Sequence, residues 1–170
     1  MRFSSIRTAD IANGLGWRVT LWCTGCLRKC PGCFNEKAQD PNFGEIFDDS
    51  AKQKIFNELS KQEISGLSLM GGEPMSKLSD NRKQMIQLCK ECKEKFPSKD
   101  IWVWSGYSFE EISSDNSMKE ILNYIDVLVD GPFIVEKKDL SCPFRGSTNQ
   151  RVILVQDSLK QGKIVEKKFE

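Results

Sequence analysis

Short runs of apolar, β-branched and aromatic residues alternate along this chain with longer stretches whose apolar positions recur at helical spacing. The short runs predict strands at residues 17–22 (WRVTLW), 67–70 (LSLM), 101–104 (IWVW), 125–130 (IDVLVD) and 151–155 (RVILV). The longer stretches predict helices over residues 48–62 and 80–96 and a broken helical stretch over residues 108–125. Asp49 or Ser50 is expected to cap the first of these helices.

This alternation of strands and helices predicts right-handed βαβ units and a largely parallel sheet. A complete eight-fold βα barrel takes about 250 residues, so a chain of 170 residues supplies only part of one. We therefore expect an α/β fold, a partial βα barrel with a mostly parallel sheet, in a single domain over residues 1–170. Asn13, Gly14 and Gly16 predict a tight turn before the first of the predicted strands.

Composition and charge argue against several classes of protein. The 25 basic residues nearly balance the 24 acidic ones, whereas nucleic-acid binding usually brings a strong basic excess. No apolar run approaches the ~20 residues of a membrane span, and the N-terminus lacks the apolar core of a signal peptide. We expect a cytoplasmic protein that binds neither nucleic acid nor a membrane. The chain has no histidine, which excludes Ser-His-Asp triads and histidine-bearing zinc sites.

The stretch CTGCLRKCPGCFN, residues 23–35, holds four of the seven cysteines. In a reducing compartment such a density favours metal or redox chemistry over disulfides. Cys26, Cys30 and Cys33 have the spacing C-x3-C-x2-C. Three thiolates on a tight loop can hold three irons of a four-iron cluster and leave the fourth iron open to another ligand, whereas ordinary clusters use four cysteines.

The same cysteines allow other interpretations. The two CxxC pairs could form a four-cysteine zinc site, although structural zinc modules usually have a longer loop between the pairs. A bacterial ferredoxin run would need a further cysteine at position 20, which is Thr20. Buried core cysteines are the third possibility. Cys23 fits this third interpretation, because it continues the predicted strand on the face of Val19 and Leu21.

A second motif, LSLMGGEPMS at residues 67–76, runs from a predicted strand into two glycines, a glutamate and a proline. Gly71 and Gly72 let the backbone turn sharply and approach a ligand closely. Pro74 biases Glu73 toward an extended conformation, so that backbone carbonyls and one carboxylate can accept hydrogen bonds from a ligand ammonium group. A plain turn between a strand and a helix is the alternative. The position of the motif downstream of C-x3-C-x2-C, with a strand and a helix between, argues against that alternative.

Together these two motifs resemble those of the radical S-adenosylmethionine superfamily. A longer series resembles, more narrowly, the activating proteins of anaerobic (class III) ribonucleotide reductases. It consists of DIANGLGWRVTLWCTGC, the Phe34-Asn35 that follows the last motif cysteine, DIWVWSGYSFEEI, DVLVDGPF and RGSTNQR. The series extends over residues 10–151. Many superfamily members have an aromatic residue just before the last motif cysteine; Gly32 stands there in this chain, as in the narrower group.

The resemblance implies two sets of ligands and one reaction. The thiolates of a [4Fe-4S] cluster are implied to come from Cys26, Cys30 and Cys33, and the methionine end of S-adenosylmethionine is implied to contact Gly71, Gly72 and Glu73. The reduced cluster would cleave S-adenosylmethionine to methionine and a 5′-deoxyadenosyl radical. This radical would take a hydrogen atom from a backbone glycine of the large subunit of an anaerobic ribonucleotide reductase. A one-electron donor, such as a flavodoxin-like protein, would reduce the cluster.

Two further residues are candidates for the cofactor site. Ser105 follows the predicted IWVW strand and could contact the ribose of S-adenosylmethionine, although a turn at the end of the strand is an equal alternative. Asp130 ends the next predicted strand and could orient the ligand, with an ordinary loop role as its rival. We expect no catalytic residue beyond the ligands of the cluster and the cofactor.

Other cysteines and arginines have simpler explanations. Cys89 and Cys92 lie on one stripe of the predicted second helix, which predicts that they belong to the core. Cys142, in an irregular segment, is expected to be a surface thiol. Arg145 and Arg151 could face the reductase or pair with local carboxylates.

Two other functions stay open. The first is an activating enzyme for another glycyl-radical enzyme, such as pyruvate formate-lyase; the short chain and the VWSGY and RGSTNQR stretches argue against it. The second, outside enzymes, is a cysteine-rich module for metal binding or electron transfer. Iron and acid-labile sulfide content separates a zinc module from the main interpretation, and cleavage of S-adenosylmethionine separates a ferredoxin.

Overall fold

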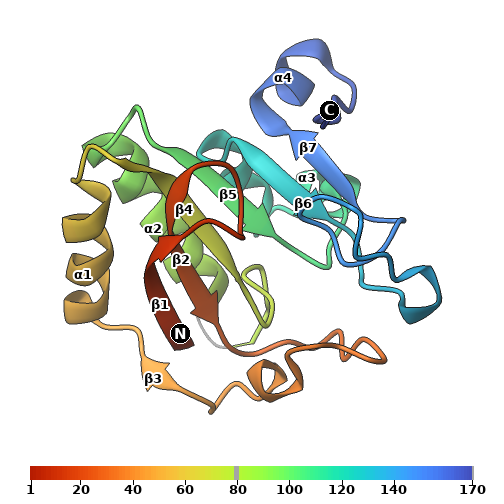
Figure 1. Ribbon diagram of the computed structural model, residues 1–170, viewed down its shortest axis with the longest axis horizontal. Helices are drawn as coiled ribbons and strands as arrows, with labels where there is room; N and C mark the ends of the chain where they lie inside the picture. Colours follow the sequence, from red (N-terminus) through yellow and green to blue (C-terminus); the bar gives the residue numbers. More distant parts are fainter. Residues whose placement is uncertain (79–80, 170) are drawn as a thin grey trace.

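A seven-stranded mixed sheet forms the centre of the computed structural model, which describes residues 1–78 and 81–169 (Figure 1). The strands lie in the order β3-β1-β2-β4-β5-β6-β7. They are β1 (Arg2–Asp10), β2 (Trp17–Cys23), β3 (Glu45–Ile46), β4 (Ile64–Gly71), β5 (Asp100–Trp104), β6 (Val127–Asp130) and β7 (Arg151–Leu154). The α-helices are α1 (Asp49–Leu59), α2 (Asn81–Lys95), α3 (Phe109–Ser114) and α4 (Val155–Gln161). Short 3₁₀ helices are η1 (Glu36–Gln39), η2 (Lys119–Asn123) and η3 (Val135–Lys137).

The middle of the sheet is parallel, as predicted. Strands β2, β4, β5 and β6 pair with one another in parallel, while β1, β3 and β7 pair antiparallel at the two sides. The α/β class is therefore confirmed, and the sheet is mixed because the segments at its edges return without a helical crossover. The partial barrel stays a prediction, since strand pairing establishes the sheet and not its closure.

The N-terminal strand β1 was not predicted from the sequence. Its residues RFSSIRTAD are mostly polar and partly exposed, so they lack the apolar signal of the central strands. The turn predicted around Gly14 joins β1 to β2 as an antiparallel pair. In this turn Asn13 Nδ2 donates to Asp10 at 2.6 Å, and Gly14 adopts a φ of 115°. A Cβ at Gly14 would lie 2.8 Å from the side chain of Arg18, so the turn requires a glycine there.

The helix boundaries need small corrections. The residue that caps α1 is Asp48, whose side chain accepts a hydrogen bond from the Ala51 amide, and not Asp49 or Ser50. Its extended backbone conformation leaves the carboxylate free to accept that bond. The helix ends at Leu59, three residues before the predicted end. Helix α2 lies within its predicted range, whose first residue, Asp80, is outside the described residues. The stretch over residues 108–125 is broken, as predicted, into α3 and η2.

The main hydrophobic core lies between the helices and one face of the sheet. Alternate residues of β2 and β4, including Val19, Leu21 and Leu67, contribute to it together with apolar residues of α1 and α2. Cys23, Cys89 and Cys92 are fully buried in this core, which confirms their predicted packing role. Burial raises the pKa of Cys23 and Cys89 and raises the pKa of Cys92 to about 12. All three are therefore protonated thiols in the core.

The opposite face of the sheet carries a smaller cluster together with buried polar groups. Trp102 and three valines of β6 and β7 form the cluster, against which Phe144 and Phe169 pack. Beside it Arg18 is fully buried, donates to Ser68 and pairs with Asp100 at 2.7 Å. This ion pair ties the start of β2 to the start of β5.

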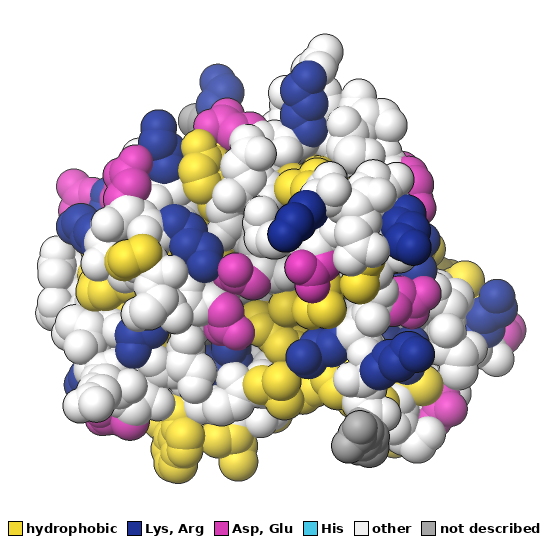
Figure 2. Space-filling view, turned by 90° about the horizontal axis from the view of Figure 1, so that it is seen from above, with side chains coloured by type: hydrophobic (Ala, Val, Ile, Leu, Met, Phe, Trp, Pro, Cys, Tyr) yellow, Lys and Arg dark blue, Asp and Glu magenta, His cyan; other side chains and the backbone are white. Residues whose placement is uncertain are grey.

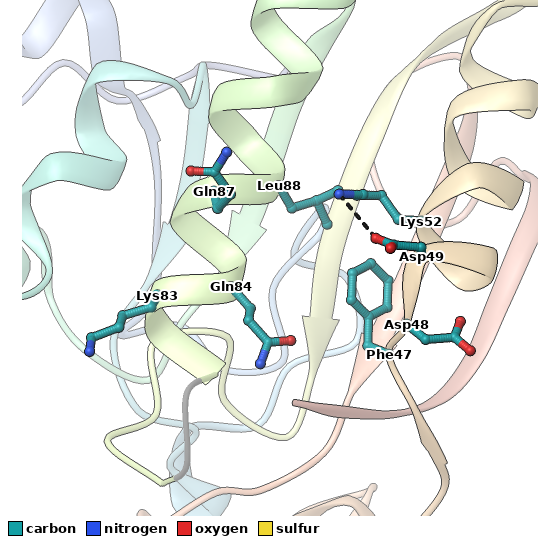
Figure 3. Close-up of a pocket in the computed structure, with 8 residues that line it drawn as sticks. All are labelled: Phe47, Asp48, Asp49, Lys52, Lys83, Gln84, Gln87 and Leu88. Carbon is teal, nitrogen blue, oxygen red and sulfur yellow. Dashed lines mark ion pairs between the residues drawn. The ribbon is translucent and has the colours of Figure 1, made fainter.

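The surface mixes charges of both signs. Seen from above Figure 1, acidic and basic side chains are interspersed around gathered hydrophobic side chains (Figure 2). An open groove of about 720 Å³ lies between α1 and α2 (Figure 3). Its lining residues are Phe47, Asp48, Asp49, Lys52, Lys83, Gln84, Gln87 and Leu88, none of which belongs to either sequence motif. Within the described part of the chain, no helix has the length and apolar character of a membrane span.

Candidate metal centre

The predicted ligand-bearing segments follow the carboxyl ends of four neighbouring parallel strands. The cysteine loop, residues 24–35, follows β2; the GGE loop, residues 71–74, lies at the end of β4. Ser105 directly follows β5, and Asp130 is the last residue of β6. Because these strands pair in parallel, their ends meet at one edge of the sheet. In α/β proteins this edge is the usual place for a ligand site.

The cysteine loop is irregular and held mainly by backbone hydrogen bonds. The amide of Gly25 donates to the Ala38 carbonyl at 2.8 Å, and the amide of Cys26 donates to Gln39 at 3.0 Å. Lys29 and Gly32 have φ values of 46° and 68°, in the left-handed region. Cys26, Cys30 and Cys33 are free thiols of intermediate exposure, so the loop presents all three candidate ligands at the surface.

The surroundings of Cys26 suit a metal-bound thiolate. Burial raises the pKa of the Cys26 thiol, and the backbone amides of Arg28 and Lys29, which donate to it, act in the opposite direction. Amide hydrogen bonds to sulfur are among the groups that stabilise and tune iron–sulfur clusters. A soft thiolate donor set without histidine fits an iron–sulfur cluster.

The ligands are not already assembled. Within residues 1–78 and 81–169, no three cysteine or carboxylate side chains are gathered closely enough to hold a metal ion. Metal sites commonly form together with binding of the metal. The three thiols, on one irregular loop, therefore fit a cluster that gathers them when it binds.

The GGE loop packs directly on the cysteine loop. The amide of Gly72 donates to the Cys23 carbonyl at 2.8 Å, and the amide of Glu73 donates to the Gly25 carbonyl at 3.2 Å. A Cβ at Gly71 would lie 2.3 Å from the Cys23 carbonyl oxygen, and a Cβ at Gly72 would lie 2.5 Å from the Ala38 carbonyl oxygen. Both positions therefore require glycine, and the structure brings the two sequence motifs into backbone contact.

Glu73 is 2% exposed, and its carboxylate accepts hydrogen bonds from other residues of the chain. Its Oε1 accepts from the Met75 amide at 2.9 Å and from Ser105 Oγ at 2.8 Å, and its Oε2 accepts from the Gly106 amide at 2.7 Å. Burial raises the pKa of Glu73, against the opposing effect of these hydrogen bonds and of Arg28. Ser105, predicted from its position after a strand, thus contacts Glu73, and this contact was not foreseen.

Arg28, between two of the motif cysteines, is a site residue that the sequence did not single out. Its guanidinium carbon lies 4.2 Å from the centre of the Tyr107 ring. Its Nη2 lies 3.2 Å from Glu111 Oε2. The only sequence signal was a basic residue inside the cysteine motif, and neither partner could be inferred from spacing.

Asp130, the last residue of β6, is fully buried, and its carboxylate is hydrogen-bonded to other residues of the chain. It accepts from Arg151 Nε at 3.0 Å and from the Phe109 amide at 2.7 Å. Arg151 also pairs with Glu110 at 2.7 Å, which is the local pairing that the sequence allowed. The role of Asp130 toward a ligand stays a prediction.

The remaining two candidates lie in the segment after β6. Arg145 donates to the Gln150 carbonyl at 3.0 Å. Cys142, expected at the surface, is of intermediate exposure and free. The same segment reaches the cysteine loop, because a Cβ at Gly32 would lie 3.1 Å from Val135.

Comparison with known proteins defines the class of this domain. The family described as "4Fe-4S single cluster domain" matches residues 12–153, which include both motifs. The chain therefore carries a domain of this iron–sulfur class, and the zinc interpretation of its cysteines is not supported.

Relatives define the family more narrowly. The chain is 41% identical to a protein of Haemophilus influenzae over 152 residues, which is 88% of this chain and 96% of the relative. It is 40% identical to a protein of Enterobacteria phage T4 over 154 residues, 89% and 93% of the two chains. It is 37% identical to a protein of Escherichia coli K12 over 154 residues, 89% and 97% of the two chains. All three relatives are named anaerobic ribonucleoside-triphosphate reductase-activating protein, and the chain belongs to this family.

Proposed function

We propose that this chain activates an anaerobic ribonucleoside-triphosphate reductase by cleaving S-adenosylmethionine at a [4Fe-4S] cluster. One electron from the reduced cluster would cleave the sulfonium to methionine and a 5′-deoxyadenosyl radical, which takes a hydrogen atom from a backbone glycine of the reductase. A glycyl radical is stabilised by its flanking amide groups, while a primary alkyl radical is not, so the transfer runs downhill. The activity resides in one domain over residues 1–170, and we place it in the cytoplasm.

The observation that carries this proposal is the backbone contact between the two motifs. Hydrogen bonds from Gly72 and Glu73 to the carbonyls of Cys23 and Gly25 hold the GGE loop against the cysteine loop. A cofactor bound to the open iron of a cluster on Cys26 would therefore lie next to the GGE loop. A structural zinc site or a ferredoxin has no use for a second loop in this position.

The hydrogen bonds of Glu73 leave room for one more donor. Two carboxylate oxygens offer about four acceptor positions, and three of those of Glu73 are used by Met75, Ser105 and Gly106. The remaining position on Oε2 and the carbonyls of the GGE loop are the acceptors that we assign to the methionine ammonium group. The chain thus holds the carboxylate rigidly before the cofactor binds, which is the preorganisation that an orienting site needs.

Ser105 and Asp130 differ in how many hydrogen-bonding positions the protein leaves free for a ligand. The Ser105 hydroxyl donates to Glu73 and accepts from the Tyr107 amide at 3.1 Å. One acceptor position remains on this hydroxyl for a ribose hydroxyl group. Asp130 is held by Arg151 and by the Phe109 amide, so we assign it an indirect role, in which it fixes the start of α3 beside the site.

The reaction needs a second protein, and the cysteine loop offers an apolar rim to one. Leu27, which follows Cys26, is 55% exposed, and Phe34, which follows Cys33, is 81% exposed. An apolar rim suits a segment of the reductase that must reach the cluster with water excluded. A one-electron donor, for example a flavodoxin-like protein, would reduce the cluster before this contact.

Cleavage of S-adenosylmethionine tests the proposal. The protein is reconstituted without oxygen with iron and sulfide, reduced, and supplied with S-adenosylmethionine, and 5′-deoxyadenosine is quantified. We expect product from the parent and from Cys23→Ala, because Cys23 packs behind the loop, and loss of at least a hundredfold in Cys30→Ala, because a ligand is missing.

The outcomes separate the alternatives. A parent that assembles its cluster but yields no 5′-deoxyadenosine is an electron-transfer module and not an activating enzyme. Loss in Cys23→Ala equal to that in Cys30→Ala, in a variant that still folds, would mean that Cys23 is itself a ligand.

A further inference from the structure

We propose that Arg28 is a positioning residue that fixes the cysteine loop to the turn after β5 and holds a positive charge beside the cluster, so that the cluster accepts an electron more readily. The inference rests on the proposed function only in taking Cys26 and Cys30 as cluster ligands. It does not depend on S-adenosylmethionine. The step concerned is the uptake of one electron by the oxidised cluster from an external low-potential reductant, with no bond made or broken.

Three contacts position Arg28 against one segment, which consists of the SGY turn, residues 105–107, and the helix α3 that follows it. Its guanidinium lies 4.2 Å from the centre of the Tyr107 ring. A Cβ at Gly106 would lie 2.4 Å from Arg28 Cδ, so the glycine makes room for the arginine stem. The guanidinium also pairs with Glu111 at 3.2 Å. Stacking and ion pairing together fix a long side chain that would otherwise be mobile.

The same turn holds the GGE loop. Ser105 and Gly106 donate to the Glu73 carboxylate, as described above. Arg28 from one side and Glu73 from the other therefore anchor the two motifs on a single short segment. Any displacement of this turn would move both motifs together.

The anchor of Arg28 is itself held in place. The carboxylate of Glu111 accepts from the Ser108 amide at 2.7 Å, and the Glu111 amide donates to Ser108 Oγ at 3.1 Å. This reciprocal pair is a capping box at the start of α3. The partner of Arg28 is thus a side chain with a fixed position on a helix.

The charge of Arg28 is only partly screened by water. Its side chain is 22% exposed, and its Nε is a buried donor without a hydrogen-bond partner among the described residues. Lys29, its neighbour, is exposed. Net charge and solvent exposure near an iron–sulfur cluster set its reduction potential, and a positive charge favours the reduced, more negative form. Arg28 also faces the buried carboxylate of Glu73, whose negative charge it offsets.

The reduction potential of the cluster, measured without S-adenosylmethionine, tests this inference. Reconstituted protein is titrated anaerobically with a chemical reductant, and the reduced cluster is quantified by electron paramagnetic resonance. In Arg28→Gln we expect a more negative potential, with about a tenfold lower ratio of reduced to oxidised cluster at a fixed solution potential, about 59 mV for a one-electron couple. Arg28→Lys, which keeps the charge, should stay close to the parent.

Two further variants test whether the direction of the shift in reduction potential follows the charge of Arg28. Glu111→Gln removes the countercharge of Arg28 while a glutamine can still complete the capping box, so its potential should shift in the positive direction, by less than Arg28→Gln shifts it in the negative direction because the Glu111 side chain is 52% exposed. Lys29→Gln removes a positive charge from the same loop at an exposed position, and its potential should match that of the parent because water screens it.

Several results would overturn the inference. One is an unchanged reduction potential in Arg28→Gln with full cluster content. Another is a shift in Lys29→Gln as large as the shift in Arg28→Gln. If Arg28→Gln fails to assemble a cluster, Glu111→Gln decides, and the absence of a positive shift overturns the inference. Iron and sulfide content of the parent keeps the proposals separable: a parent with a cluster but no cleavage of S-adenosylmethionine contradicts the proposed function and leaves this titration valid.

Discussion

Glu73 shows at the scale of one residue how the site combines burial with hydrogen bonding. The carboxylate is almost completely removed from water, which raises its pKa above the ordinary value of 4.5. Donors from Met75, Ser105 and Gly106 act against this effect. Arg28 is the positive charge that acts on this buried carboxylate from within the chain. A cationic ligand group bound beside Glu73 would add a second positive charge, closer to the carboxylate. Under the proposed function this ligand group is the methionine ammonium, and burial of Glu73 without it lowers the stability of the free protein.

This balance predicts a pH dependence that belongs to Glu73. A carboxyl with a higher pKa in the folded than in the unfolded chain stabilises the fold when protonated. The contribution is present below the ordinary value of 4.5 and is lost as the pH rises through the raised pKa. Thermal unfolding of the metal-free parent and of Glu73→Gln, followed over this range, should show stability falling with pH more in the parent than in the variant.

Ser76→Ala is a suitable control, since this serine is buried, its amide donates to the Glu73 carbonyl at 3.0 Å, and it does not titrate in this range. It should keep the pH dependence of the parent. A difference between the parent and Glu73→Gln that stays constant over the range would contradict a raised pKa for Glu73.

At the scale of elements, contact between the two loops depends on glycine. Gly72 has no room for a Cβ because the Ala38 carbonyl oxygen and the Gly25 backbone lie in its place. Backbone atoms cannot move aside as the end of a long side chain can. The cysteine loop must therefore shift away from β4 if this position carries a side chain.

Gly72→Ala should accordingly lose the cluster. We expect its iron and sulfide content after reconstitution to fall at least severalfold, because the displaced cysteine loop no longer holds its ligands beside the GGE loop. Gly162→Ala is the matched control: this residue follows α4 as its C-cap with a φ of 65°, and a Cβ there meets nothing within 4 Å. The control should lose about 1–2 kcal/mol of stability, the cost of a left-handed conformation for a residue with a Cβ, and keep its cluster. Full iron content in Gly72→Ala would contradict the role given to the contact.

The elements that the sequence predicted are those with a strong periodic signal. The central strands and α1 and α2 bury continuous apolar faces, so their positions follow from the pattern of residues. Strands β1 and β3 lie toward one side of the sheet with polar or exposed residues and gave no such signal. Burial of Cys23 followed from strand alternation, whereas the antiparallel direction of β7 depends on pairing that the sequence does not encode locally.

The same distinction holds within the site. The spacing of the cysteines and the GGE sequence are local, so the sequence identified both loops as candidate ligand segments. The contacts of Glu73 with Ser105 and Gly106 join residues 32 and 33 positions apart. The pair of Arg28 and Glu111 spans 83 positions. Such contacts depend on the order of strands in the sheet, and no pattern along the chain predicts them.

At the scale of the whole molecule, the sheet order explains how a small chain brings its candidate ligand segments to one edge. Strands β2, β4, β5 and β6 are neighbours in the sheet, and each contributes one candidate ligand segment at its carboxyl end. The antiparallel strands β1, β3 and β7 flank these four parallel strands in the sheet and contribute no candidate ligand. The three motif cysteines are partly exposed, so a second protein could reach them, in agreement with membership in a family named for activation of a reductase.

We propose that the reductase gives up a hydrogen atom to the 5′-deoxyadenosyl radical, and an isotope label follows this transfer. The reductase is prepared with deuterated glycine, and the reconstituted and reduced protein is mixed with it and with S-adenosylmethionine in the absence of oxygen. We expect a glycyl radical on the reductase, measured by electron paramagnetic resonance, and one deuterium in each 5′-deoxyadenosine formed with it, measured by mass spectrometry. Unlabelled 5′-deoxyadenosine without a glycyl radical, from a protein with a full cluster, would contradict it.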